Sequence, residues 1–137
     1  MRDFQRSAVY TAEQGHALYD GYEMSLEEVR DFCCEVFCNQ NVLNLWGQWI
    51  DLHELQIHDG RRRRTPCAKG KVHDSGNSIH IILPTFSRTR LIVLHELAHL
   101  LTPRKFSSHG MEYASNYLYL IGLILGEDHQ LRSPLSR

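Results

Sequence analysis

Apolar residues recur at helical spacing in the first third of the chain. Ser25 precedes this segment and Glu28 follows three residues later, which is the spacing of a capping box. We therefore expect a helix from Leu26 to about residue 40. Residues 45–50 are expected to add a further helical turn or a strand. The apolar positions that define the helical period are Val29, Phe32, Cys33, Val36 and Phe37.

The middle of the chain changes to strand-like alternation. Leu55 and Ile57 predict a strand that enters a turn at Asp59-Gly60. Residues 68–73 and 78–83 flank the sequence Asp-Ser-Gly-Asn, whose residues favour a tight turn, so they predict a β-hairpin. The expected result is a short antiparallel sheet of three strands.

The helical period then returns for two further segments. Residues 88–101 predict a helix that is apolar nearly all round, capped by Thr85 or Ser87 and stopped by a following proline. Residues 111–125 predict a last helix that ends at Gly126. The buried helix, the sheet and the following helix together predict an α+β fold.

Composition favours one soluble globular domain over residues 1–137. The chain is 42% hydrophobic and 23% charged, with a formal net charge of −1, which argues against a disordered chain and against a globally basic nucleic-acid binder. Its longest apolar runs are far shorter than the ~20 residues of a membrane-spanning helix. The first 15 residues resemble a short extended arm rather than a secretory signal, so the expected compartment is the cytoplasm.

The strongest chemical signal is the sequence His95-Glu96-Leu97-Ala98-His99 on the second predicted helix. Histidines four residues apart lie on one helix face, so His95 and His99 can bind the same ion. Zinc accepts two imidazoles and a third protein ligand, which leaves one position for a water whose pKa it lowers. Glu96 lies beside that position and is the expected general base.

A third ligand is expected from the segment after the helix. His109 lies ten residues after His99, beyond a loop long enough to turn the chain back. Glu112, one turn into the next helix, is the alternative ligand. The metzincin spacing is absent, because Thr102 and Lys105 stand where its glycine and third histidine would be.

These motifs resemble those of compact zincins of the SprT-like and minigluzincin type. The shared pattern is the HELAH segment followed by His109-Gly110-Met111-Glu112-Tyr113. The opening residues 2–10 also resemble a group of uncharacterised metallohydrolases from actinobacteria and their phages, in which the residues at 111 and 113 are usually proline and phenylalanine. The resemblance implies a small zincin-like domain whose sheet edge lies alongside an extended peptide, in the host cytoplasm if the chain is phage-encoded.

Four further residues are candidates for substrate contact. Residues 78–83 form the strand directly before the active helix, so His80 and Ile81 are expected to meet a peptide that pairs with this strand. Tyr113 and Tyr117 are candidates to bind a developing oxyanion. The alternatives are a solvent-facing histidine on an alternating strand and two tyrosines that pack the last helix.

Two other clusters have simpler interpretations. Cys33, Cys34 and Cys38 lie within six residues but lack the spacing of a zinc knuckle or a redox pair, so we interpret them as packing residues. Arg61–Arg64 could contact phosphates of nucleic acid, but without interleaved aromatic residues a solvated turn is preferred.

The sequence therefore predicts a zinc metallohydrolase, and a metallopeptidase acting on a peptide or protein before other hydrolases. The alternative is a zinc-bound regulatory or binding module with a peptidase-like site. Glu96 argues against that alternative, because metal binding alone does not need it.

Overall fold

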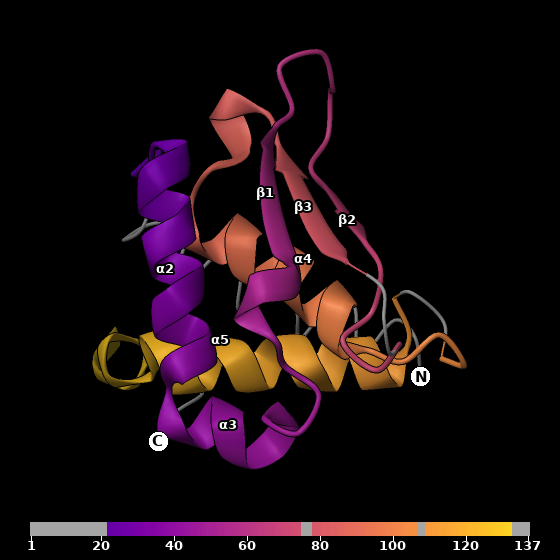
Figure 1. Ribbon diagram of the computed structural model, residues 1–137. Helices are drawn as coiled ribbons and strands as arrows, with labels where there is room; N and C mark the ends of the chain where they lie inside the picture. Colours follow the sequence, from indigo (N-terminus) through magenta and orange to yellow (C-terminus); the bar gives the residue numbers. More distant parts are fainter. Residues whose placement is uncertain (1–21, 75–77, 107–108, 133–137) are drawn as a thin grey trace.

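The computed structural model describes residues 22–74, 78–106 and 109–132, and the predicted N-terminal arm lies outside them. Their α+β class agrees with the prediction from sequence (Figure 1). The helices are α2 (Leu26–Cys38), α3 (Gln40–Trp46), α4 (Arg90–Leu101) and α5 (Met111–Arg132), and the strands are β1 (Leu55–Asp59), β2 (Cys67–Lys69) and β3 (Ile79–Leu83).

The sheet is mixed, so the prediction of an all-antiparallel sheet was wrong. Its strand order is β1-β3-β2, with β3 in the centre. Strand β2 pairs antiparallel with β3, as the predicted hairpin requires, whereas β1 runs parallel to β3 with Ile57 opposite Ile81. The physical reason is that alternation reports which face of a strand is buried but not the partner or direction of pairing.

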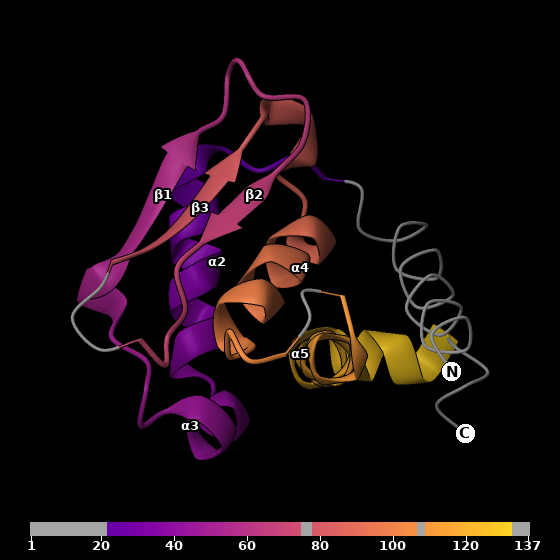
Figure 2. The same ribbon diagram turned by 90° about the vertical axis from the view of Figure 1, so that its right-hand side faces the viewer.

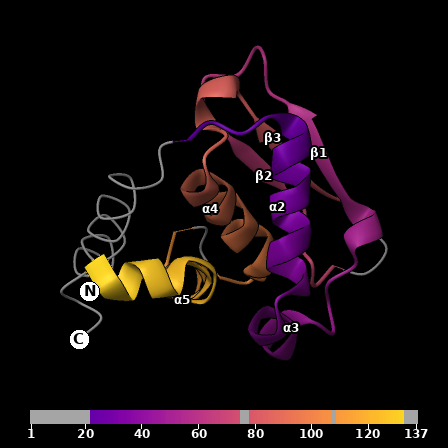
Figure 3. The same cartoon turned by 90° about the vertical axis from the view of Figure 1, so that its left-hand side faces the viewer.

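Helices α2 and α4 cover the same face of the sheet (Figures 2 and 3). The β3 residues Ile79, Ile81 and Leu83 are buried on that face. Helix α5 packs on α4, so α4 is enclosed between the sheet and α5 (Figure 2). This position explains why α4 is apolar nearly all round and why any polar group on it needs a partner.

Local sequence sets the helix boundaries, in part differently from prediction. The capping box of α2 is present, with the Glu28 N–H donating to Ser25 Oγ at 3.1 Å and the Ser25 N–H to Glu28 Oε1 at 3.0 Å. Helix α4 is capped by Thr89 rather than by Thr85 or Ser87, because residues 85–87 form a separate 3₁₀ turn.

Two other observed helix boundaries also differ from the predicted ones. Helix α5 continues past Gly126, because an interior glycine costs a helix only about 1 kcal/mol and packing can offset it. In residues 45–50, predicted as a further helical turn or a strand, helix α3 extends to Trp46 and a turn follows.

Hydrogen bonds from other segments fix α4 at both ends. At its start, buried Arg88 donates to the Leu83 carbonyl at 3.2 and 3.1 Å and to Asp59 Oδ1 at 2.9 Å, which ties the helix entry to the ends of β3 and β1. At its end, the last four carbonyls would otherwise lack partners. They accept from Thr102 Oγ1, Lys71 Nζ, the Val72 N–H and Asn116 Nδ2.

The described residues share one apolar core that contains parts of every α-helix and of strands β1 and β3, and Ala68 of β2 packs against it. None of the helices in the described ranges combines the length and the apolar character needed to cross a bilayer.

Candidate metal centre

Three imidazoles converge at the C-terminal half of α4. His95 and His99 lie one turn apart on α4, and His109 precedes the first turn of α5. Each offers a ring nitrogen, and these nitrogens lie within 4.8 Å of one another. The ring centroids are 5.2 Å apart for His95 and His99, 4.8 Å for His99 and His109, and 6.0 Å for His95 and His109. The sequence prediction of this trio agrees with the geometry.

The donor set suits a divalent transition metal. Burial, together with the nearby His95, His109 and Lys71, lowers the pKa of His99 to about 3. Burial and His95 also lower the pKa of His109. Both rings are therefore neutral at ordinary pH, as metal ligands must be. Because zinc–nitrogen bonds are about 2.0–2.1 Å long, binding of one ion by all three rings would bring their nitrogens closer together than 4.8 Å.

Glu112 does not belong to this group. Its side chain is exposed, and the convergent ligands within the described residues are the three histidines alone. His109 lies just before α5 with its ring near those of His95 and His99, whereas Glu112 lies in the first turn of α5.

Glu96 is a buried carboxylate beside the trio. It is 4% exposed, and its Oε2 lies 3.8 Å from His95 Nε2. Burial raises its pKa, and the neighbouring His95 partly opposes that rise. A carboxylate with a raised pKa is a stronger base than an exposed glutamate, which suits proton transfer near neutral pH.

The two tyrosines lie behind the imidazoles. The hydroxyl of Tyr113 donates to the His95 carbonyl at 3.4 Å, and that of Tyr117 to the Leu91 carbonyl at 3.5 Å. The Tyr117 ring is fully buried, with its centroid 5.2 Å from that of His95. These contacts join α5 to α4 and favour a packing role for both tyrosines over an oxyanion role.

A cavity of about 560 Å³ opens in front of the trio. One wall is β2 with its following turn, and the other is the polar side of α4 with the loop to α5. The lining residues are Pro66, Cys67, Ala68, Lys69, Gly70, Lys71, His95, Glu96, His99, Arg104 and His109. The β2 wall and its lysines were not predicted from sequence, because no residue spacing signals which strand faces the metal.

His80 and Ile81 do not line this cavity. Strand β3 is paired on both sides, so the expectation that its edge is free for a peptide was wrong. Ile81 is fully buried in the core. His80 lies on the opposite sheet face, where its Nδ1 is 2.9 Å from Nε2 of His58 on β1. The edge beside the cavity belongs to β2 (Figure 2).

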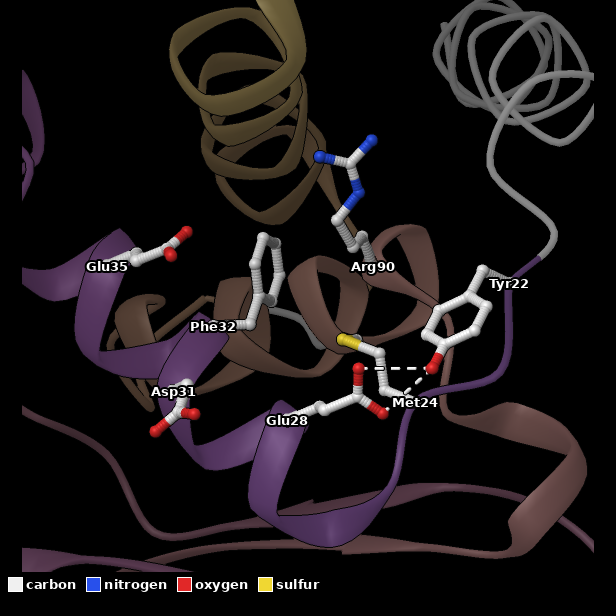
Figure 4. Close-up of a pocket in the computed structure, with 7 residues that line it drawn as sticks. All are labelled: Tyr22, Met24, Glu28, Asp31, Phe32, Glu35 and Arg90. Atoms are coloured by element: carbon white, nitrogen blue, oxygen red, sulfur yellow. Dashed lines mark hydrogen bonds between the residues drawn. The ribbon is translucent and has the colours of Figure 1, made fainter.

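A second pocket, of about 480 Å³, lies between the start of α2 and α4 (Figure 4). Its lining combines the apolar side chains of Met24 and Phe32 with several carboxylates and Arg90. Tyr22 also lines it, and its hydroxyl donates to Glu28 at 3.0 Å. It contains no imidazole or thiol, so the cavity at the histidine trio is the better candidate for chemistry.

The remaining sequence candidates lie elsewhere. Cys33 is buried, Cys34 and Cys38 are exposed, and no cysteine joins a group of three convergent ligands in the described part of the chain. Arg61–Arg64 form an exposed turn that does not line either pocket. Arg61 Nη2 contacts Asp59 Oδ2 at 3.3 Å.

Comparison with known proteins adds no assignment to this geometry: no protein-family model, no curated protein and no solved structure matches the chain.

Proposed function

We propose that this protein is a zinc-dependent metallohydrolase of the peptidase type. The observation that carries the proposal is the convergence of His95, His99 and His109 beside the buried carboxylate of Glu96, all on one open cavity. Three imidazoles are a known ligand set for catalytic zinc. A carboxylate held next to them is a feature that metal storage or a structural metal site does not need.

The three histidines would hold the ion and leave the cavity side open to substrate. Zinc, when bound, supplies a Lewis acid that polarises a carbonyl and lowers the pKa of water. Glu96 accepts a proton from the attacking water and later delivers it to the departing amine. Its raised pKa favours both transfers near neutral pH.

The substrate chain is proposed to lie along β2. The edge of β2 opposite β3 is unpaired within the described residues and borders the cavity. An extended peptide can pair with such an edge through main-chain hydrogen bonds, which bring one of its amides to the trio. This replaces β3 by β2 as the expected substrate strand, while the mode of pairing is as predicted.

Replacing Glu96 by Gln tests the proposal. Glu96→Gln keeps the size of the side chain but removes its basicity, so zinc should stay bound while peptide hydrolysis falls by about 10²–10⁴-fold. Zinc content is measured by elemental analysis after gel filtration, and hydrolysis by mass spectrometry of a mixed peptide pool. His95→Ala is the matched control and should lose both the metal and the activity.

Each outcome decides between named alternatives. A purified chain that holds little zinc, and gains none when zinc is added, contradicts the proposal. Zinc bound at one per chain with an unchanged biological effect in Glu96→Gln would instead favour a binding or regulatory module.

A further inference from the structure

The cavity in front of the histidine trio is rich in positive charge. Three cationic side chains line it, namely Lys69, Lys71 and Arg104, against the single carboxylate of Glu96. Arg104 is paired through its Nε with Asp74. The two lysines contact no carboxylate in the described part of the chain. A bound divalent ion would add to this excess of positive charge.

Lys71 is the best placed of these cations. It follows β2 after one intervening residue, Gly70, is half-buried, and its Nζ donates to the carbonyl of the ligand residue His99 at 2.7 Å. An ammonium group has three donors, and the described contacts use one of them. Lys71 lines the same cavity as the trio, close to the β2 strand along which a peptide is proposed to lie.

Local backbone geometry fixes this placement. Gly70 has a φ of +90°, which turns the chain sharply after β2. The Val72 N–H then donates to the Leu100 carbonyl at 2.9 Å, so residues on both sides of Lys71 are held. A cation positioned in this way keeps its charge at one place and loses little conformational entropy when an anion binds.

We infer that the cavity selects substrates that present a carboxylate to Lys71, beside the bond that is cleaved. This inference rests on the proposed peptidase function and names its substrate class. The carboxylate has two sources in a peptide, an acidic side chain or the free C-terminus, and both present the same group to the ammonium. A charge-assisted bond to a half-buried lysine also disfavours neutral isosteres, which offer the ammonium no opposite charge.

The test uses binding, so that it does not depend on turnover. The full chain carrying Glu96→Gln is loaded with zinc and titrated calorimetrically with three N-acetylated hexapeptides. The first is neutral, with an internal Gln and an amidated C-terminus. The second replaces that Gln by Glu, and the third keeps Gln but has a free C-terminal carboxylate. Moving the Gln or Glu through each position covers the unknown register.

One of the acidic peptides should bind about 5–10-fold more tightly than the neutral peptide, since a partly exposed ion pair contributes about one factor of ten or less. Whether it is the second or the third peptide identifies the source of the carboxylate. Adding Lys71→Gln should reduce this preference to about twofold or less, while Lys71→Arg should retain it.

Lys105→Gln is the matched control. It makes the same change in net charge at an exposed lysine that does not line the cavity, so the preference should persist. Thermal unfolding of each variant separates the second role of Lys71 at the end of α4 from selectivity, because lost stability alone does not change the ratio of two affinities.

Two results would overturn the inference and are distinguishable. Equal, zinc-dependent binding of acidic and neutral peptides would refute carboxylate selection while leaving the peptidase proposal intact. Zinc-loaded protein that binds none of the peptides and cleaves none in its wild-type form would refute both.

Discussion

The ring of Tyr113 stacks on the ring of His99, with centroids 4.2 Å apart and planes inclined by 19°. Tyr113 is buried on α5, whereas His99 lies on α4, so the contact joins the two helices at the proposed metal centre. His109 lies two residues before α5, and its ring centroid is 5.2 Å from that of Tyr113. Tyr113 thus contacts imidazoles on both sides of the cluster, and we expect this contact to couple packing of α5 to metal affinity.

Substitution of Tyr113 by phenylalanine distinguishes a packing role for this residue from an oxyanion role. Tyr113→Phe keeps the ring and removes the hydroxyl that donates to the His95 carbonyl at 3.4 Å, so hydrolysis should change by less than about threefold. Loss of an oxyanion donor would instead cost about 10²–10³ in kcat. Steady-state rates of the zinc-loaded variant decide between the two.

Removal of the ring should have a different effect. Tyr113→Ala leaves a cavity between α4 and α5 and should lower the free energy of unfolding by about 3–5 kcal/mol. Urea unfolding measures this loss, and Tyr113→Phe is the control. A stable Tyr113→Ala variant with unchanged zinc affinity would contradict the coupling described above.

Substitutions of two exposed residues, His109 and Glu112, test which of them is the third metal ligand. His109→Ala should weaken zinc binding by more than the roughly 10–100-fold that loss of an outer hydrogen-bonding partner costs. Glu112→Gln should leave zinc affinity unchanged, because Glu112 is not among the convergent ligands. Competition with a chromophoric zinc chelator measures both affinities. Since both side chains are exposed, neither change should disturb the fold.

The convergence of the three histidines was predictable because its determinants are local. His95 and His99 share a helix face by spacing alone, and a short loop limits where His109 can lie. The β2 wall of the cavity was not predictable, because Lys71 reaches the His99 carbonyl across 28 positions of sequence. The parallel pairing of β1 with β3 was missed for the same reason: Asp59 meets Arg88 only once the fold exists. Local patterns determined the elements, and long-range pairing determined which of them face the site.

Cys33 should react differently from its neighbours. Burial raises its pKa to about 12, with the adjacent Cys34 contributing, so its thiol stays protonated and inaccessible. Cys34 and Cys38 are exposed and should be alkylated by iodoacetamide while the protein is folded. Mass spectrometry of digested protein should find Cys33 modified only after unfolding. Rapid modification of Cys33 in the native state would contradict its burial.

The raised pKa of Cys33 predicts a loss of stability at alkaline pH. Above about pH 9 the unfolded chain releases the Cys33 proton, whereas the folded chain retains it up to about pH 12. Stability should therefore fall as pH rises through this window, by at most about 1.4 kcal/mol per pH unit from this group. Cys33→Ala should show a shallower fall between pH 8 and 10 in urea unfolding under reducing conditions.

We expect alanine substitution to have opposite effects on stability at Gly70 and at Gly122. At Gly70 the backbone φ is +90°, and an added Cβ would lie 2.7 Å from the Ser78 carbonyl oxygen, so Gly70→Ala should cost about 1–3 kcal/mol of stability. At Gly122, on the exposed side of α5, an added Cβ meets nothing within 4 Å. Gly122→Ala should therefore stabilise the protein by about 0.5–1 kcal/mol through helix propensity.

The pair also tests whether the turn after β2 positions the cavity. Gly70→Ala displaces the segment that carries Lys71, so in the zinc-loaded chain it should weaken binding of the preferred acidic peptide as well as stability. Gly122 does not line the cavity, and its substitution should leave that binding unchanged. Urea unfolding and calorimetric titration of both variants give the two readouts. If Gly70→Ala lowers stability but leaves peptide binding intact, the turn serves folding alone and the cavity wall does not depend on its geometry.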